Sequence, residues 1–138
     1  MSDRLEYANR TYNRNDLTSL REMPKNIEAE QHLLGALLLD GSVLSRISED
    51  VGPLPRDDFF SERNRIIYET ILHRAATSDD FDPTVICSDL EIAGLLDKAG
   101  GRQYVASLTD NVGPLSAVTE YAKIIRDTSR RRQLISVA

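Results

Sequence analysis

Glycine and proline divide most of this 138-residue sequence into short segments, and this spacing limits the possible folds more than any other feature. Between the breaks, apolar residues recur at intervals of three and four, which is the period of a helix with one buried face. No segment alternates strictly with β-branched enrichment. We therefore predict an all-α fold, a compact bundle of about six helices with short connections. The breaks lie at Gly41, 52–55, Gly94, 100–101 and 113–114.

Polar residues that commonly cap helices stand at the predicted helix starts. Asn26, Ser42 and Ser61 each precede a segment of helical period. Asp82 does the same, and Pro83 follows it at the first helical position, where the missing N–H of proline costs nothing. Four helices are therefore expected to begin directly after these residues.

The last predicted helix runs from Ser116 to the end of the sequence without a stop signal. An apolar stripe occupies its first half, arginines at 130–132 interrupt it, and Leu134 and Ile135 resume it. Such a stripe is more typical of an inner face than of a ligand site. It can pack on its own domain or on a second subunit, and the pattern leaves both open. The stripe consists of Val118, Tyr121, Ala122 and Ile125.

Charge is distributed unevenly along the chain. Residues 1–23 carry four basic and four acidic side chains and show no helical period, which favours a flexible tail. Residues 24–120 carry 8 basic and 17 acidic side chains, whereas residues 121–138 carry five basic and one acidic. An acidic body repels phosphate backbones and suits a protein partner better than nucleic acid. The arginines at 130–132 point in three directions on a helix, which favours solvation or ion pairs between subunits.

The sequence shows no catalytic pattern. A phosphate-binding loop needs a lysine directly after a glycine, and the three lysines follow Pro24, Asp97 and Ala122. His32 and His73 stand alone, and the single cysteine, Cys87, cannot form an internal disulfide. We interpret the acidic pairs at 49–50, 57–58 and 79–80 as solvated or capping residues rather than as an acid and base or magnesium ligands.

Neither a membrane helix nor a secretory signal is indicated. No apolar run approaches the roughly 20 residues that span a bilayer, and the first ten residues have no apolar core. One unpaired cysteine agrees with a reducing compartment. We therefore expect a cytoplasmic protein.

The string PKNIEAEQHLLGALLLD at 24–40 resembles the opening motif of DnaB-type replicative DNA helicases. Further blocks follow in the order that this family shows, and together they extend the resemblance over residues 24–138. Residues 1–23 have no counterpart. The blocks are DFF at 58–60 with NRIIY at 64–68, LL at 95–96 before GG at 100–101 and Tyr104, Pro114, YA at 121–122, and RRQLI at 131–135.

The resemblance implies the amino-terminal domain of a ring-shaped hexameric helicase that unwinds DNA with ATP. The ATP, magnesium and DNA sites would lie in a RecA-like motor domain, and no cofactor is expected in these 138 residues. In the family, a helical head is followed by a helical hairpin, and paired hairpins form a collar that docks primase and, in some systems, a helicase loader. By this resemblance, 1–23 is a flexible tail, 24–115 the head, and 116–138 the first arm of the hairpin, whose second arm is not included.

From the resemblance and the last helix together, we predict a non-catalytic scaffold and docking domain. One alternative is a free-standing phage or plasmid helicase-head regulator that works without a motor. Another is a single-stranded DNA-binding module, which would need stacking aromatic residues on a basic face. The residues predicted to contact a second subunit or a partner are Tyr121, Ile124, Ile125, Arg131 and Leu134.

Overall fold

The computed structural model describes residues 26–78, 80–110 and 112–137, with the side chains of 136 and 137 left out. The described residues form helices and no strand, which confirms the all-α prediction, while the predicted tail at 1–23 lies outside them. None of these helices is both long and apolar enough to cross a bilayer. The elements are α2 (Ile27–Leu39), α3 (Val43–Asp50), η1 (Arg56–Asp58), α4 (Glu62–Ala75), α5 (Pro83–Ile92), α6 (Gly101–Ser107), η2 (Leu115–Ala117) and α7 (Val118–Val137), where η1 and η2 are 3₁₀ turns.

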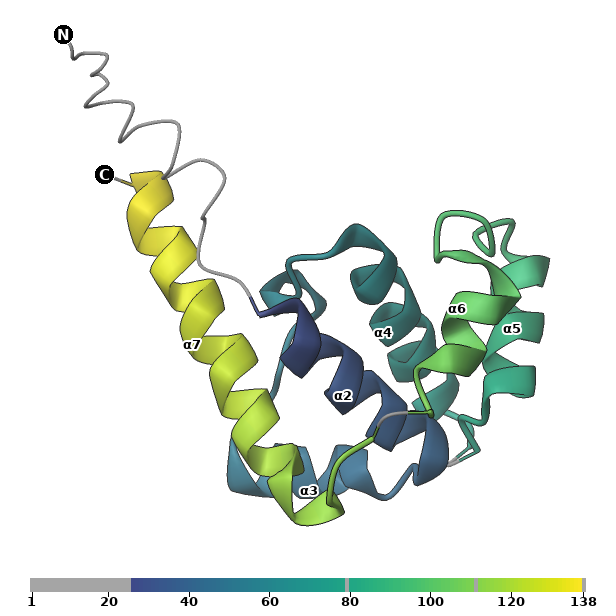
Figure 1. The fold of residues 1–138 in the computed structure, drawn as a ribbon, viewed down its shortest axis with the longest axis horizontal. Coiled ribbons are helices and arrows are strands. Elements are labelled where there is room, and N and C mark those ends of the chain that lie inside the picture. The colour runs from purple at the N-terminus through teal and green to yellow at the C-terminus, as the bar shows by residue number, and fades with distance from the viewer. Residues whose placement is uncertain (1–25, 79, 111, 138) are drawn as a thin grey trace, which may run out of the picture. The chain divides into compact units, whose positions relative to one another are not determined.

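Helix α2 is the centre of the core. It lies between α4 and the first part of α7 (Figure 1), and α5 and α6 complete the layer beyond α4. Leu33, Leu34 and Leu37 are fully buried, because α2 is apolar on nearly every side. From α7, Val118 and Ala122 reach the same core. The stripe on the last helix therefore packs on its own domain.

Contacts group Asn26–Arg130 into one compact unit and assign residues 131–137 of α7 to a second unit. Residues 118–130 of the last helix thus pack with the head. The boundary between a head at 24–115 and a hairpin arm from 116 stays a prediction.

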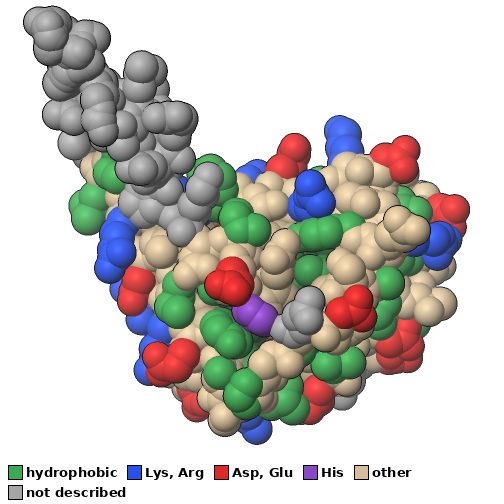
Figure 2. Space-filling model, in the orientation of Figure 1, with side chains coloured by type: hydrophobic (Ala, Val, Ile, Leu, Met, Phe, Trp, Pro, Cys, Tyr) green, Lys and Arg blue, Asp and Glu red, His purple; other side chains and the backbone are tan. Residues whose placement is uncertain are grey.

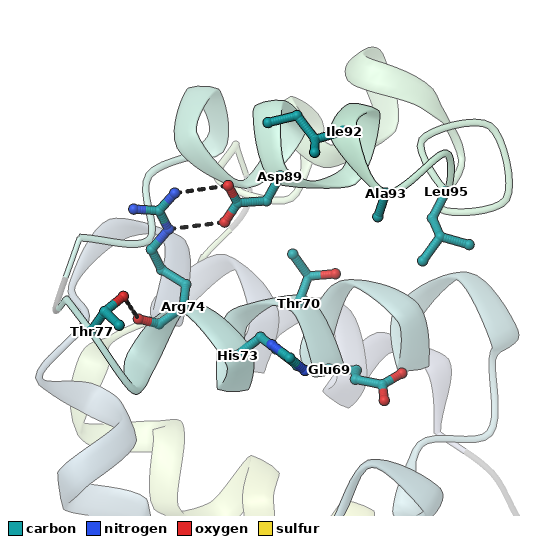
Figure 3. A pocket seen from close by; sticks show the side chains of 9 residues that line it. All are labelled: Glu69, Thr70, His73, Arg74, Thr77, Asp89, Ile92, Ala93 and Leu95. Atoms are coloured by element: carbon teal, nitrogen blue, oxygen red, sulfur yellow. Dashed lines mark hydrogen bonds and ion pairs between the residues drawn. The ribbon is translucent and has the colours of Figure 1, made fainter.

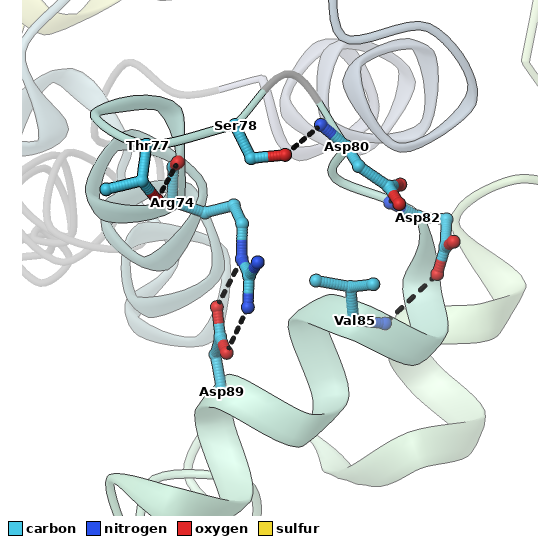
Figure 4. Close-up of polar contacts among 7 residues, drawn as sticks. All are labelled: Arg74, Thr77, Ser78, Asp80, Asp82, Val85 and Asp89. Carbon is cyan, nitrogen blue, oxygen red and sulfur yellow. Dashed lines mark hydrogen bonds and ion pairs between the residues drawn. The ribbon is translucent and has the colours of Figure 1, made fainter.

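Three of the four predicted caps are present. Asn26 accepts a hydrogen bond from the Ala29 N–H at 2.9 Å, Ser61 accepts one from Asn64 N–H at 3.4 Å, and Asp82 accepts one from Val85 N–H at 3.0 Å (Figure 4). Each cap satisfies one of the backbone donors that a helix start leaves unpaired.

The prediction that Ser42 caps α3 is wrong. Its hydroxyl donates to the Asp40 carboxylate at 2.7 Å, and its backbone N–H donates to the same oxygen at 3.0 Å. Ser42 has helical backbone angles and makes no cap hydrogen bond to α3. Its two hydrogen bonds lower the pKa of Asp40. The turn between α2 and α3 is therefore closed by Asp40.

Gly35 allows α2 to approach the segment after α6. A Cβ atom at this position would lie 2.1 Å from the Leu108 carbonyl oxygen and 2.6 Å from a methyl carbon of Val112. We expect Gly35→Ala to lower the free energy of unfolding by about 1–3 kcal/mol, because overpacking outweighs the better helix propensity of alanine. Urea denaturation measures this. A variant as stable as the parent would show that the two segments separate easily.

Candidate interaction surface on the last helix

A buried polar contact fastens α7 to the head. The Ser129 hydroxyl donates to the Asp58 carboxylate at 2.8 Å, and both side chains are buried. The interpretation of the 57–58 pair as solvated is therefore wrong for Asp58, while Asp57 is exposed. The Asp58 carboxylate can be buried because it accepts a hydrogen bond from a distant helix inside the structure.

An aromatic contact joins the start of α7 to α2. The rings of His32 and Tyr121 are stacked, with their centroids 5.1 Å apart and their planes at 15°. The His32 Nε2 also lies 3.9 Å from a carboxylate oxygen of Glu28, one turn earlier on α2. Nearby, the Thr119 hydroxyl donates to Asp50 at 3.2 Å. The first half of α7 is thus held by apolar, aromatic and polar contacts.

The exposure of α7 changes after Ser129. Arg130 and Arg131 are exposed, Leu134 is 72% exposed and Ile135 is 50% exposed. Basic side chains line the helix in the space-filling view, interspersed with acidic and apolar ones (Figure 2). Arg130 lies four residues before Leu134, and Arg131 four before Ile135, so each arginine neighbours one of the two apolar side chains on the helix surface. We call these four residues the α7 tip.

The five predicted contact residues occupy different environments. Ile125 is 1% exposed and belongs to the core, and Tyr121 and Ile124 are half-buried against that core. Arg131 and Leu134 are exposed. An interface role stays a prediction for all five, but only the last two present whole side chains to the surface. Ile135 was not among the predicted contacts, although its position next to Leu134 on the same helix could have indicated it.

A buried polar network links three helices. The Glu30 carboxylate accepts hydrogen bonds from Phe60 N–H at 2.6 Å, Ser61 N–H at 3.3 Å and the Asn64 side-chain amide at 3.0 Å. The Tyr104 hydroxyl donates to the other side of the Asn64 amide at 2.5 Å. Because each group has a partner, the network orients α2, α4 and α6 relative to one another.

A groove lies between α4 and α5, with a volume of about 520 Å³ (Figure 3). At one end, the Arg74 guanidinium donates two hydrogen bonds to the Asp89 carboxylate, at 2.9 and 2.7 Å (Figure 4). These hydrogen bonds lower the pKa of Asp89 and raise that of Arg74. We call this cavity the α4/α5 groove, and it is lined by Glu69, Thr70, His73, Arg74, Thr77, Asp89, Ile92, Ala93 and Leu95.

The Arg74–Asp89 pair predicts how stability depends on pH. The native state favours the ionised carboxylate, so the pair stabilises the fold above the usual Asp pKa of 3.8 and loses this contribution as pH falls through the lower native pKa. Asp89→Asn should therefore be modestly less stable than the parent at pH 7, with the difference shrinking as the pH falls through the lowered native pKa of Asp89. Urea denaturation at pH 7 and in acid measures this, with Asp97→Asn at an exposed position as the control.

The described residues contain no cluster of three or more His, Cys, Asp or Glu side chains that could hold a metal ion. His73 lines the groove but has neither another histidine nor an unpaired carboxylate beside it there.

The chain is similar to known proteins over most of its length. Residues 22–127 match the family described as DnaB-like helicase N-terminal domain. A curated "Replicative DNA helicase DnaB" from Treponema pallidum is 37% identical over 115 residues, and "Replicative DNA helicase DnaC" from Bacillus subtilis is 35% identical over 123 residues. These alignments cover 83% and 89% of this chain but 26% of each relative, so the chain spans about a quarter of their length.

A solved structure has the same fold. The N-terminal domain of DnaB helicase from Mycobacterium tuberculosis superposes with a TM-score of 0.77 and is 26% identical in sequence. The match covers 83% of this chain and 80% of that one. The described helices therefore have the arrangement seen in that domain.

Proposed function

Because this chain belongs to the DnaB-like helicase N-terminal domain family, we propose that it is the scaffold and docking domain of a hexameric ATP-dependent replicative DNA helicase. The observation that carries the docking role is the exposure of Leu134 and Ile135 on a helix whose first half is firmly packed. Arginine is enriched at protein–protein interfaces, and the burial of exposed apolar side chains on association is favourable. The α7 tip is accordingly the surface that contacts neighbouring subunits.

ATP and magnesium would bind elsewhere in the helicase. In this chain no lysine follows a glycine, and the described ranges hold no cluster of metal-binding side chains. The residues here thus do not fit a nucleotide and its metal ion, and we derive no catalytic step from them. In the proposed helicase, strand separation belongs to the motor domain, and this domain organises the ring.

Besides other subunits, the proposed partners are primase and a helicase loader, and the proposed compartment is the cytoplasm. The excess of acidic over basic side chains in residues 24–120 supports protein docking, because this charge repels DNA. The resemblance to DnaB-type helicases suggests primase in particular. No residue-level footprint for primase follows from the described surface.

Light scattering tests the proposal. We expect the chain to self-associate at high concentration, and to form a complex with the carboxy-terminal domain of the primase from the same source. Leu134→Arg should weaken self-association at least about tenfold, because it places a charge at the centre of an apolar contact. Leu39→Arg is the matched control, since Leu39 is also an exposed leucine at the end of a helix. A chain that stays monomeric and does not bind primase would contradict the docking role.

A further inference from the structure

The turn between α2 and α3 contains the one place in the sequence where glycine follows an aspartate, and no asparagine is followed by glycine. Asp40 and Ser42 are exposed, and Gly41 between them is half-buried. An aspartate before glycine is chemically labile, because glycine has no side chain to keep its backbone nitrogen away from the neighbouring carboxyl group. This surface turn is separate from both the α7 tip and the α4/α5 groove.

The reaction open to this pair is an isomerisation within the chain. The backbone nitrogen of Gly41 attacks Cγ of the Asp40 side chain, a C–N bond forms, and the carboxyl O–H leaves as water together with the amide proton. Water then attacks the main-chain carbonyl of Asp40 in the resulting succinimide ring and breaks its bond to the Gly41 nitrogen. The water lost in the first step is regained in the second, so the isoaspartate product has an unchanged mass.

The folded turn holds the two reacting groups apart. One carboxylate oxygen of Asp40 accepts hydrogen bonds from the Ser42 hydroxyl at 2.7 Å and from the Ser42 N–H at 3.0 Å. Asp40 has a ψ of 101°, which places the Gly41 nitrogen on the side of the Cα–C bond away from Cβ, whereas the ring needs it on the same side. The Val43 N–H donates to the Asp40 carbonyl at 3.1 Å and closes the turn. The ring can therefore form only when the turn opens.

Ionisation of Asp40 restrains the reaction further. Ring closure proceeds through the protonated carboxyl group, because a carboxylate has no good leaving group. The hydrogen bonds from the Ser42 hydroxyl and N–H lower the pKa of Asp40. At neutral pH the reactive form is therefore scarcer in the folded turn than in an unfolded chain.

We propose that Asp40–Gly41 is the site at which this chain forms isoaspartate, and that Ser42 restrains the reaction by holding the turn closed. The product routes the main chain through Cβ and Cγ of residue 40, so the turn gains one backbone atom. Directly after the turn, α3 begins at Val43, which is 2% exposed and belongs to the core. Isomerisation therefore shifts the start of α3 against the core, and this inference does not depend on the proposed docking role.

Tryptic peptide mapping after prolonged incubation at neutral pH tests the site. Cleavage after Lys25 and Arg46 releases residues 26–46, in which Asp40 is the only aspartate. We expect a second chromatographic form of this peptide with unchanged mass, which a protein-isoaspartate methyltransferase labels with a methyl group from S-adenosylmethionine. Asp40→Glu is the matched control, because its ring would need six members and the second form should be absent. If the form is absent even from the parent unfolded in guanidinium chloride, the site is overturned.

Rates of isomerisation in three samples test the restraint. We expect the folded parent to react at least about tenfold more slowly than the unfolded parent, because the turn must open first. Folded Ser42→Ala should react at least about threefold faster than the folded parent, since it lacks one of the two hydrogen bonds to the carboxylate. Equal rates in the folded and unfolded parent would overturn the protection by the turn, and a Ser42→Ala variant as slow as the parent would overturn the role of Ser42. Thermal melting followed by circular dichroism verifies that the variant is folded.

Discussion

Glu30→Ala is expected to lower the free energy of unfolding by about 3–5 kcal/mol, because it removes the acceptor for one buried and two partly buried donors. The Glu30 side chain is 2% exposed, so water cannot replace it without opening the core. The backbone N–H groups of Phe60 and Ser61 and the amide of Asn64 would lose their partner at the start of α4. Urea denaturation followed by circular dichroism measures the loss.

Glu28→Ala is the matched control for this substitution. Glu28 lies on the same helix but is exposed, and in its ion pair with His32 the two atoms are 3.9 Å apart. Its replacement should change the free energy of unfolding by less than about 0.5 kcal/mol. If both variants lose the same small amount of stability, the hydrogen bonds of Glu30 contribute little, and the orientation of α4 relative to α2 must come from apolar packing.

Elements fixed by neighbouring residues could be predicted from the sequence. The caps at Asn26, Ser61 and Asp82 each involve a side chain and an N–H three residues later, and the apolar period identifies each helix. Ser42 does not form the predicted cap, and the reason is local as well, because its hydroxyl donates to the Asp40 carboxylate instead. The start of α3 could still be predicted, because the helix begins at Val43, directly after Ser42.

The buried polar contacts could not be predicted, because their partners are far apart in the sequence. Glu30 meets Phe60 thirty residues later, and Asp58 meets Ser129 at a separation of 71. From the sequence, Glu30 looks like a favourable charge in the first turn of a helix, and Asp58 like half of a solvated pair. Only tertiary packing decides which carboxylates are buried.

The groove illustrates a third limit. Ile92 is two residues after the buried Leu90, and positions two apart on a helix point in different directions. The period therefore places Ile92 outside the α5 core face, but it gives no indication that α4 supplies the other wall. A groove needs the packing of two helices, which no single segment specifies.

The buried and exposed parts of α7 should respond differently to the same type of substitution. Ile125→Ala is expected to lower the free energy of unfolding by about 2–5 kcal/mol, because it leaves a cavity where α7 meets the core. Leu134→Ala should change that free energy by less than about 0.5 kcal/mol, since Leu134 is already exposed to water. Urea denaturation of dilute, monomeric protein gives both values.

Measuring the self-association of the same two variants distinguishes residues that pack inside the domain from residues that contact a second subunit. Leu134→Ala should weaken association while Ile125→Ala, when folded, should leave it nearly unchanged, because its side chain is enclosed by the head. Ile125 shares the helical stripe with residues predicted as subunit contacts, so sequence period alone cannot tell the two roles apart. Ile125→Ala could instead keep the parent's free energy of unfolding and lose self-association. That result would mean that α7 separates from its own head when subunits associate, and that the buried half of α7 forms the subunit interface.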